Sequence, residues 1–174
     1  MTIDDKLNIL LNGGDLRSIS GANEIVELIN RQEDFDILFN HLYSKNRLII
    51  MRAADSIEKI SRQHINFLNK HKTSILGLIA KATDKELKWH LAQIVSRLNL
   101  NDNEKKETFE ILKKWAQDKN ESKITRVNAI QALSEIHCNN ELLSNCFNKI
   151  LNNIEKENIP SINARIRKLR KDNR

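Results

Sequence analysis

The chain has 174 residues, 40% of them hydrophobic and 30% charged, which is enough apolar material for one domain with a sizeable core. One proline and four glycines are too few for the many turns of a strand-rich fold, so the composition predicts an all-α protein. The formal net charge is +6, but residues 160–174 hold six basic residues and one acidic residue and so carry most of it. The first 159 residues therefore lack the positive excess of a surface that follows a phosphate backbone.

Neither a membrane helix nor a secretory signal is predicted. The longest apolar run, residues 75–80, is far shorter than the roughly 20 residues that cross a bilayer. The chain opens with acidic residues instead of the basic region and small-residue cleavage site of a signal peptide. We therefore expect a cytoplasmic protein.

In chain order, a short first helix is expected to end at Gly13-Gly14, with Asp15 capping the helix that follows. Thr83, with Glu86 three places later, has the pattern of a capping box and predicts a helix start there. Apolar residues recur at steps of three or four in four further segments, which predicts helices. These residues are Phe35, Leu38, Phe39 and Leu42; Ile75, Leu76, Leu78 and Ile79; Phe109, Leu112 and Trp115; Leu142, Leu143, Phe147, Ile150, Leu151 and Ile154.

Four stretches repeat one pattern in which the fourth, eighth and eleventh places are apolar or small: residues 50–60, 88–98, 126–136 and, more loosely, 159–169. Counted from Leu28, the closing apolar residues of successive copies lie 32, 38, 38 and 33 residues apart. Such a period is typical of stacked helix pairs. We expect a single domain, residues 1–174, of about five helical hairpins, with atypical capping repeats at about 1–31 and 139–174.

The second-helix pattern resembles a known superfamily. The stretch from Arg126 to Ile136, with Ala129, Ala132 and Leu133, resembles the second-helix signature of HEAT repeats, and residues 51–57 and 89–95 look like two further copies. The chain as a whole is similar to small bacterial HEAT-like proteins. The resemblance implies a right-handed α-solenoid and a scaffold that binds other proteins, with no enzymatic activity and no cofactor.

A polar row is the candidate binding surface. With the first residue of each patterned helix as place 0, places 3, 7 and 10 point inward and places 2, 5 and 9 point outward. Because second helices line the concave side of stacked pairs, the outward places should form one row there. The row is Ser20, Asn23, Glu27, Arg52, Asp55, Lys59, His90, Gln93, Arg97, Asn128, Gln131, Glu135, Ser161, Ala164 and Lys168.

Contacts with a protein or peptide are expected in the central part of this row: Arg52, Asp55, Lys59, His90, Gln93, Arg97, Asn128 and Gln131. Mixed charges and amides suit hydrogen bonding to a peptide or to a helix of another protein better than they suit bare phosphate. The alternative is that the row is only the solvated face that any amphipathic helix presents.

The basic carboxy-terminal segment allows two interpretations. Its cations are Arg165, Arg167, Lys168, Arg170 and Lys171, while Ile162, Ile166 and Leu169 should point inward. It is either a polar cap whose charges complement the helix dipole, or an anion-binding element for nucleic acid, an acidic protein or anionic lipid. A remote third hypothesis is a HEAT-like alkylpurine DNA glycosylase, which uses aromatic and acidic residues on a basic face.

The two tryptophans are expected in different environments. Trp89, on the flank of its helix, is expected to pack between repeats, with an exposed partner-binding anchor as the alternative. Trp115 lies on the apolar stripe of Phe109 and Leu112 and is expected in the core.

No metal site or catalytic motif is predicted. The five histidines never occur at the i,i+4 spacing of a helical metal site, and Cys138 and Cys146 are too far apart for a C-x-x-C motif, so both are expected to be inert thiols. No nucleophile elbow, Gly-rich phosphate loop or H-E-x-x-H sequence occurs.

Overall fold

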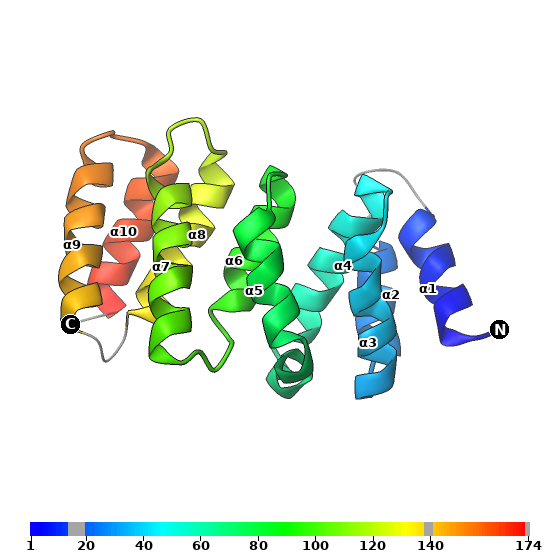
Figure 1. Ribbon diagram of the computed structural model, residues 1–174. Helices are drawn as coiled ribbons and strands as arrows, with labels where there is room; N and C mark the ends of the chain where they lie inside the picture. The colour runs from blue at the N-terminus through cyan, green and yellow to red at the C-terminus, as the bar shows by residue number, and fades with distance from the viewer. Residues whose placement is uncertain (14–19, 138–140, 173–174) are drawn as a thin grey trace. The chain divides into compact units, whose positions relative to one another are not determined.

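The structure, a computed structural model, describes residues 1–13, 20–137 and 141–172, and these ranges contain helices and no strand (Figure 1). The prediction of an all-α protein is confirmed for them. The chain forms two compact units, Met1–Lys72 and Thr73–Arg174. No helix in the described ranges is long and apolar enough to cross a membrane.

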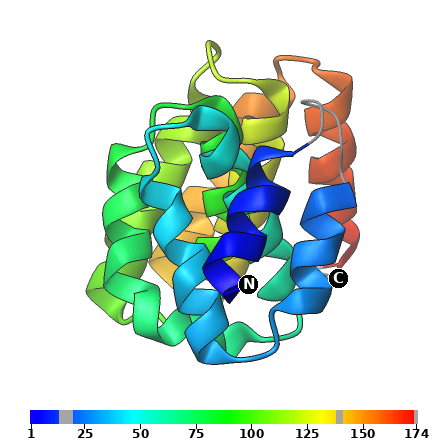
Figure 2. The same cartoon turned by 90° about the vertical axis from the view of Figure 1, so that its right-hand side faces the viewer.

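The first unit is built around α4. Its helices are α1 (Ile3–Asn12), α2 (Ser20–Leu28), α3 (Gln32–Asn40) and α4 (Arg47–Ile60), with the 3₁₀ helices η1 (His41–Tyr43) and η2 (Ile65–His71). Helix α4 packs against α1, α2, α3 and η1, and α1 also contacts α2 and α3. Figure 2 shows α1 flanked on its two sides by α2 and α3.

The second unit places alternate helices side by side. Its helices are α5 (Lys72–Lys81), α6 (Lys85–Val95), α7 (Asp102–Gln117), α8 (Lys123–Ile136), α9 (Glu141–Glu155) and α10 (Pro160–Asp172), of which only the first residue of α5 belongs to the first unit. Helix α8 packs against α6 on one side and α10 on the other, while α7 contacts α9. The second helix of each hairpin thus lies beside the second helix of the next.

The repeated apolar places form the cores of both units. The predicted inward residues of all four patterned stretches are buried. They are Ala53, Ile57, Ile60, Leu91, Val95, Leu98, Ala129, Leu133, Ile136, Ile162, Ile166 and Leu169. Burial of these side chains is the main favourable term in folding, at about 25 cal/mol per Å² of apolar surface.

One expected core residue is on the surface. Leu142 is 80% exposed, whereas Phe147, Ile150, Leu151 and Ile154 of the same helix are buried. At about 100° per residue, Leu142 lies roughly 130° around α9 from the centre of that stripe. Its inclusion in the predicted core was wrong, because step size alone does not fix the centre of a stripe.

A short polar side chain caps the start of α6. The Asp84 carboxylate accepts hydrogen bonds from the backbone N–H groups of Glu86 and Leu87, so Asp84 caps α6 and the prediction of a Thr83 cap was wrong. Asp84 is one residue closer to the helix, so its carboxylate reaches these two backbone N–H groups. Its negative charge is also stabilised by the positive end of the helix dipole. Helix α1 ends at Gly13 as predicted, and the predicted cap Asp15 lies outside the described residues. Helix α10 begins at Pro160, where the missing N–H costs no helical hydrogen bond.

A buried arginine joins three segments of the second unit. Arg126 is 2% exposed, and its Nε donates to the carbonyl oxygen of Ala116 at the end of α7 (2.8 Å). Its Nη1 and Nη2 each lie 2.9 Å from a carboxylate oxygen of Glu157, between α9 and α10. These hydrogen bonds lower the pKa of Glu157 more than its burial raises it. The pair therefore fixes the connection that leads into α10.

Candidate binding groove between α8 and α10

An open groove lies between the exposed faces of α8 and α10. Helix α8 begins beside Ser122, whose hydroxyl accepts a hydrogen bond from the Thr125 N–H, and α10 begins at Pro160. The buried stripe of each helix packs into the core, which leaves the opposite edges free to border a hollow of about 440 Å³. Its lining is Lys123, Ile124, Val127, Ser161, Ala164, Arg165 and Lys168.

The central part of the groove is apolar. Ile124 is 46% exposed, Val127 is half-buried one turn further along α8, and Ala164 faces them from α10 as an exposed small residue. Side chains three apart on a helix lie on the same face, so Ile124 and Val127 form a continuous strip. An exposed aliphatic strip opposite an alanine leaves space for an apolar side chain of a partner.

The charged residues that line the groove are all basic. Lys123, Arg165 and Lys168 line it, and none of its lining residues is acidic. Among the described residues, Lys123 and Lys168 take part in no ion pair, so their charge is neutralised only by solvent and salt. At a Debye length of about 8 Å in physiological salt, cations lining one groove reinforce each other's potential at its centre.

Arg165 is held in position by α8. The Gln131 side-chain oxygen accepts a hydrogen bond from Arg165 Nη1 (2.6 Å), and the Gln131 amide N–H donates to a Glu135 carboxylate oxygen (2.8 Å). The amide dipole therefore orients the guanidinium across the helix interface and leaves its remaining N–H groups available. Gln131 and Arg165 were predicted in two separate sites, whereas the structure joins them by a hydrogen bond.

The other tail cations divide into two groups. Arg170 forms an ion pair with Glu155 (2.9 Å) and donates to the Asn152 side chain (2.9 Å), so it fastens α10 to α9. Arg167 and Lys171 are exposed and, within the described ranges, take part in no ion pair. Because Ile162, Ile166 and Leu169 are buried as predicted, α10 is at once a packed helix and a carrier of exposed positive charge.

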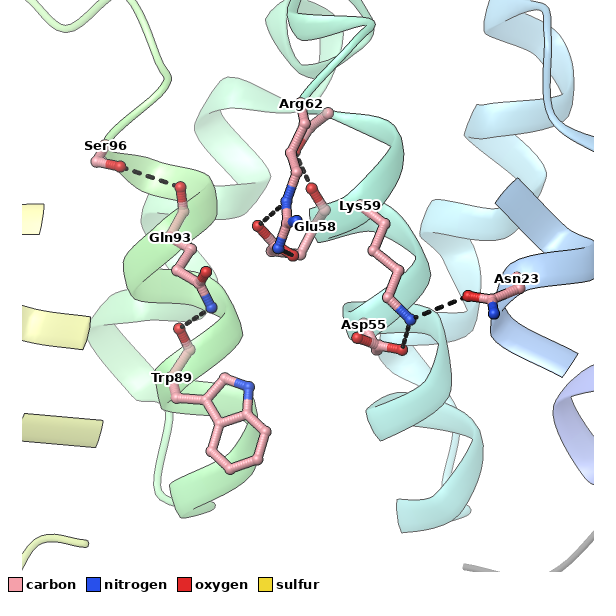
Figure 3. Close-up of polar contacts among 9 residues, drawn as sticks. Asn23, Asp55, Glu58, Lys59, Arg62, Trp89, Gln93 and Ser96 are labelled. Carbon is pink, nitrogen blue, oxygen red and sulfur yellow. Dashed lines mark hydrogen bonds and ion pairs between the residues drawn. The ribbon is translucent and has the colours of Figure 1, made fainter. Parts of the chain in front are cut away.

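In the first unit, the predicted row is largely engaged within the protein. Arg52 is only 9% exposed, and its Nη1 donates to the carbonyl oxygen of Leu11 (2.8 Å) and to that of Gly13. Lys59 pairs with Asp55 (2.8 Å) and reaches the side chain of Asn23 (3.5 Å), as Figure 3 shows. The expectation that Arg52 is exposed was wrong.

In the second unit, His90 is 6% exposed, so its predicted exposure was also wrong. Arg52 and His90 both occupy place 2, which lies only about 100° around the helix from the buried stripe and nearer to it than places 5 and 9. Gln93 and Arg97 are half-buried, and the Gln93 amide donates to the carbonyl oxygen of Trp89 in its own helix (3.5 Å; Figure 3). Asn128 is half-buried and donates to the carbonyl oxygen of Ile124 (2.9 Å).

One of the two tryptophan predictions is confirmed. Trp115 is 7% exposed, which confirms it as a core residue, and the Lys88 ammonium lies 5.5 Å from the centre of its ring. Lys88 also pairs with Glu121. Trp89 is half-buried, and its ring centre lies 5.0 Å from that of His90.

Lys123 and Ile124, which line the groove, were not among the predicted site residues. The repeat pattern started at Arg126, so the first turn of α8 was left outside it. A signal was present, because Ser122 is a favourable cap and Ile124 is an aliphatic residue off the predicted inward stripe. The α10 side was in the predicted row, as Ser161, Ala164 and Lys168.

No group of three or more histidine, cysteine or carboxylate residues within the described ranges could hold a metal ion. His71 stacks on Phe39, with ring centres 3.9 Å apart, and its Nε2 lies 2.6 Å from a carboxylate oxygen of Asp36. Cys146 is a half-buried free thiol, and Cys138 lies outside the described residues.

No family model, curated protein or solved structure matches this chain. The proposed function therefore rests on the groove and its lining residues.

Proposed function

We propose that this chain is a non-enzymatic helical-repeat scaffold of the HEAT type, in which stacked hairpins form a right-handed solenoid. Its function is to bind a segment of another protein, and the binding site is the groove between α8 and α10. The packing order α6, α8, α10 within the second unit supports the repeat architecture, because each second helix lies beside the next. The three second-helix patterns that resemble HEAT repeats support it independently.

The observation that carries the proposal is an exposed aliphatic strip in a groove that is also lined by cations. An isoleucine that is 46% exposed, beside Val127 and Ala164, lies on a surface that no other described element covers. Protein interfaces combine apolar contact area with polar and charged side chains, and the lining of the groove offers both. A hollow of about 440 Å³ is large enough for one or two partner side chains.

A matched pair of substitutions tests this site. Ala164 and Ala80 are both exposed alanines on helices of the second unit, but only Ala164 lines the groove. A random 12-residue peptide library is panned against the full chain, and each bound peptide is measured against Ala164→Trp and Ala80→Trp. We expect peptides whose binding falls at least about tenfold with Ala164→Trp and is unchanged by Ala80→Trp. If no bound peptide distinguishes the two variants, the groove is not the binding site.

Nucleic-acid binding through α10 is a second candidate function. It is favoured by the exposed Arg167, Lys168 and Lys171, which take part in no ion pair among the described residues. The aliphatic strip favours a protein partner, because a phosphate backbone gives it nothing to pack against. Under the second candidate, an oligonucleotide of arbitrary sequence binds equally to Ala164→Trp and wild type, and binding weakens when Arg167 and Lys171 become Gln.

A further inference from the structure

We infer that the groove selects an acidic segment of its partner in which aliphatic residues are flanked by carboxylates, and that Arg165, positioned by Gln131, binds one of those carboxylates. This inference rests on the proposed function and adds to it the chemistry of the partner and the residue that recognises it.

Charge complementarity sets the sign of the partner. Lys123 lies at the start of α8, and Arg165 and Lys168 lie on the facing edge of α10, so cations border the apolar strip from both helices. A partner that places an aliphatic side chain on Ile124 and Val127 brings its flanking residues to these cations. Acidic flanking residues form charge-assisted hydrogen bonds there, and basic ones are repelled.

The hydrogen bond to Gln131 restricts the conformation of the Arg165 side chain. A free arginine side chain loses much rotamer freedom when it binds a carboxylate, and this loss opposes binding. Because Gln131 Oε1 already holds Nη1 at 2.6 Å, and Glu135 orients the Gln131 amide at 2.8 Å, part of that ordering is complete before the partner arrives. Gln131 is therefore a positioning residue, and Arg165 is the contact residue.

Three labelled peptides of 12 residues test the chemistry by fluorescence anisotropy with the full chain. The first has a central Leu-Ile pair flanked by two acidic residues on each side, with Gly and Ser elsewhere. In the second peptide amides replace the acids, and in the third peptide Ala-Ala replaces the aliphatic pair. We expect the first to bind about tenfold more tightly than either of the others, with affinity falling as salt rises.

Matched variants identify the residues. Arg165→Gln is expected to weaken the first peptide about tenfold, whereas Arg167→Gln, on the same helix but outside the groove, leaves its binding nearly unchanged. Gln131→Leu is expected to weaken it about threefold, with the same peptide preference retained. Asn128→Leu is the control, because Asn128 donates only to a carbonyl of its own helix.

The outcomes separate this inference from the proposed function. If library peptides are blocked by Ala164→Trp but the amide peptide binds as well as the acidic one, the inference fails and the proposed function stands. If Arg165→Gln and Arg167→Gln weaken the acidic peptide equally, attraction is diffuse and the inference fails. If Ala164→Trp affects no peptide but converts a dimer to a monomer by light scattering, a second copy occupies the groove and both fail.

Discussion

The two units each bury an arginine that fastens a neighbouring helix, and they differ in what the arginine meets. In the first unit, Arg52 of α4 donates to the carbonyl oxygens of Leu11 and Gly13 at the end of α1. In the second unit, Arg126 of α8 meets one such carbonyl, from Ala116, and also both carboxylate oxygens of Glu157.

The difference shows how buried charge is accommodated in each case. The last carbonyls of a helix lack partners within it and carry the negative end of its dipole, so they stabilise a cation such as Arg52 there. The Arg126 site instead combines a helix end with a bidentate ion pair, in which each partner depends on the other. The Arg52 site joins α4 to an earlier segment of the chain, and the Arg126 site joins α8 to both an earlier and a later one.

The largest expected effect is the loss of Arg126. Arg126→Met leaves the half-enclosed Glu157 carboxylate without its partner, so we expect the second unit to lose about 3 kcal/mol of unfolding free energy. Urea unfolding measures the loss. Adding Glu157→Gln should recover part of it, because the unpaired charge is then absent. An additive double variant would show that the two side chains are not coupled.

Arg52→Met is expected to cost less, about 2 kcal/mol, because the carbonyls of Leu11 and Gly13 that it leaves unsatisfied are neutral groups at a helix end that water can reach. Hydrogen exchange should localise the effect to α1 and α4. Arg52→Lys retains the charge but not the fork geometry and should fall between wild type and Arg52→Met. A loss equal to that of Arg126→Met would remove the distinction between the two sites.

The smallest expected effect is a pH dependence in the first unit. Burial raises the pKa of Asp36, but hydrogen bonds from Lys70, Gln32 and His71 outweigh it and lower the pKa from 3.8 to about 2. The folded state thus binds this proton less readily than the unfolded state, so its stabilisation is present above the ordinary pKa and is lost as pH falls from about 4 to 2. The expected loss is on the order of 1 kcal/mol.

Asp36→Asn provides the control for this titration. The variant should be less stable than wild type at pH 6 and should lose less additional stability between pH 4 and pH 2. The measurement is hydrogen exchange of α3 and η2 amides across this range. Identical pH profiles for wild type and variant would show that Asp36 does not contribute.

The sequence predicts the buried side of these helices better than it predicts their exposed side. Inward places were correct in all four patterned stretches because burial of apolar surface dominates folding and repeats with the helix period. Arg52 and His90 were placed wrongly because their positions lie beside the buried stripe. A side chain there can turn either toward a neighbouring helix or toward solvent, and periodicity does not distinguish these two orientations. Lys123 and Ile124 were missed because a groove depends on which edges of two helices face each other.

The position of the tryptophans has a practical consequence. Trp89 and Trp115 are the only tryptophans of the chain, and both belong to the second unit, whereas the described aromatic core of the first unit is formed by phenylalanine. Indole emission therefore reports on residues of Thr73–Arg174, while far-ultraviolet circular dichroism follows the helices of both units. Coincident midpoints from the two signals would mean one cooperative transition, and separate midpoints would resolve the melting of each half without any label.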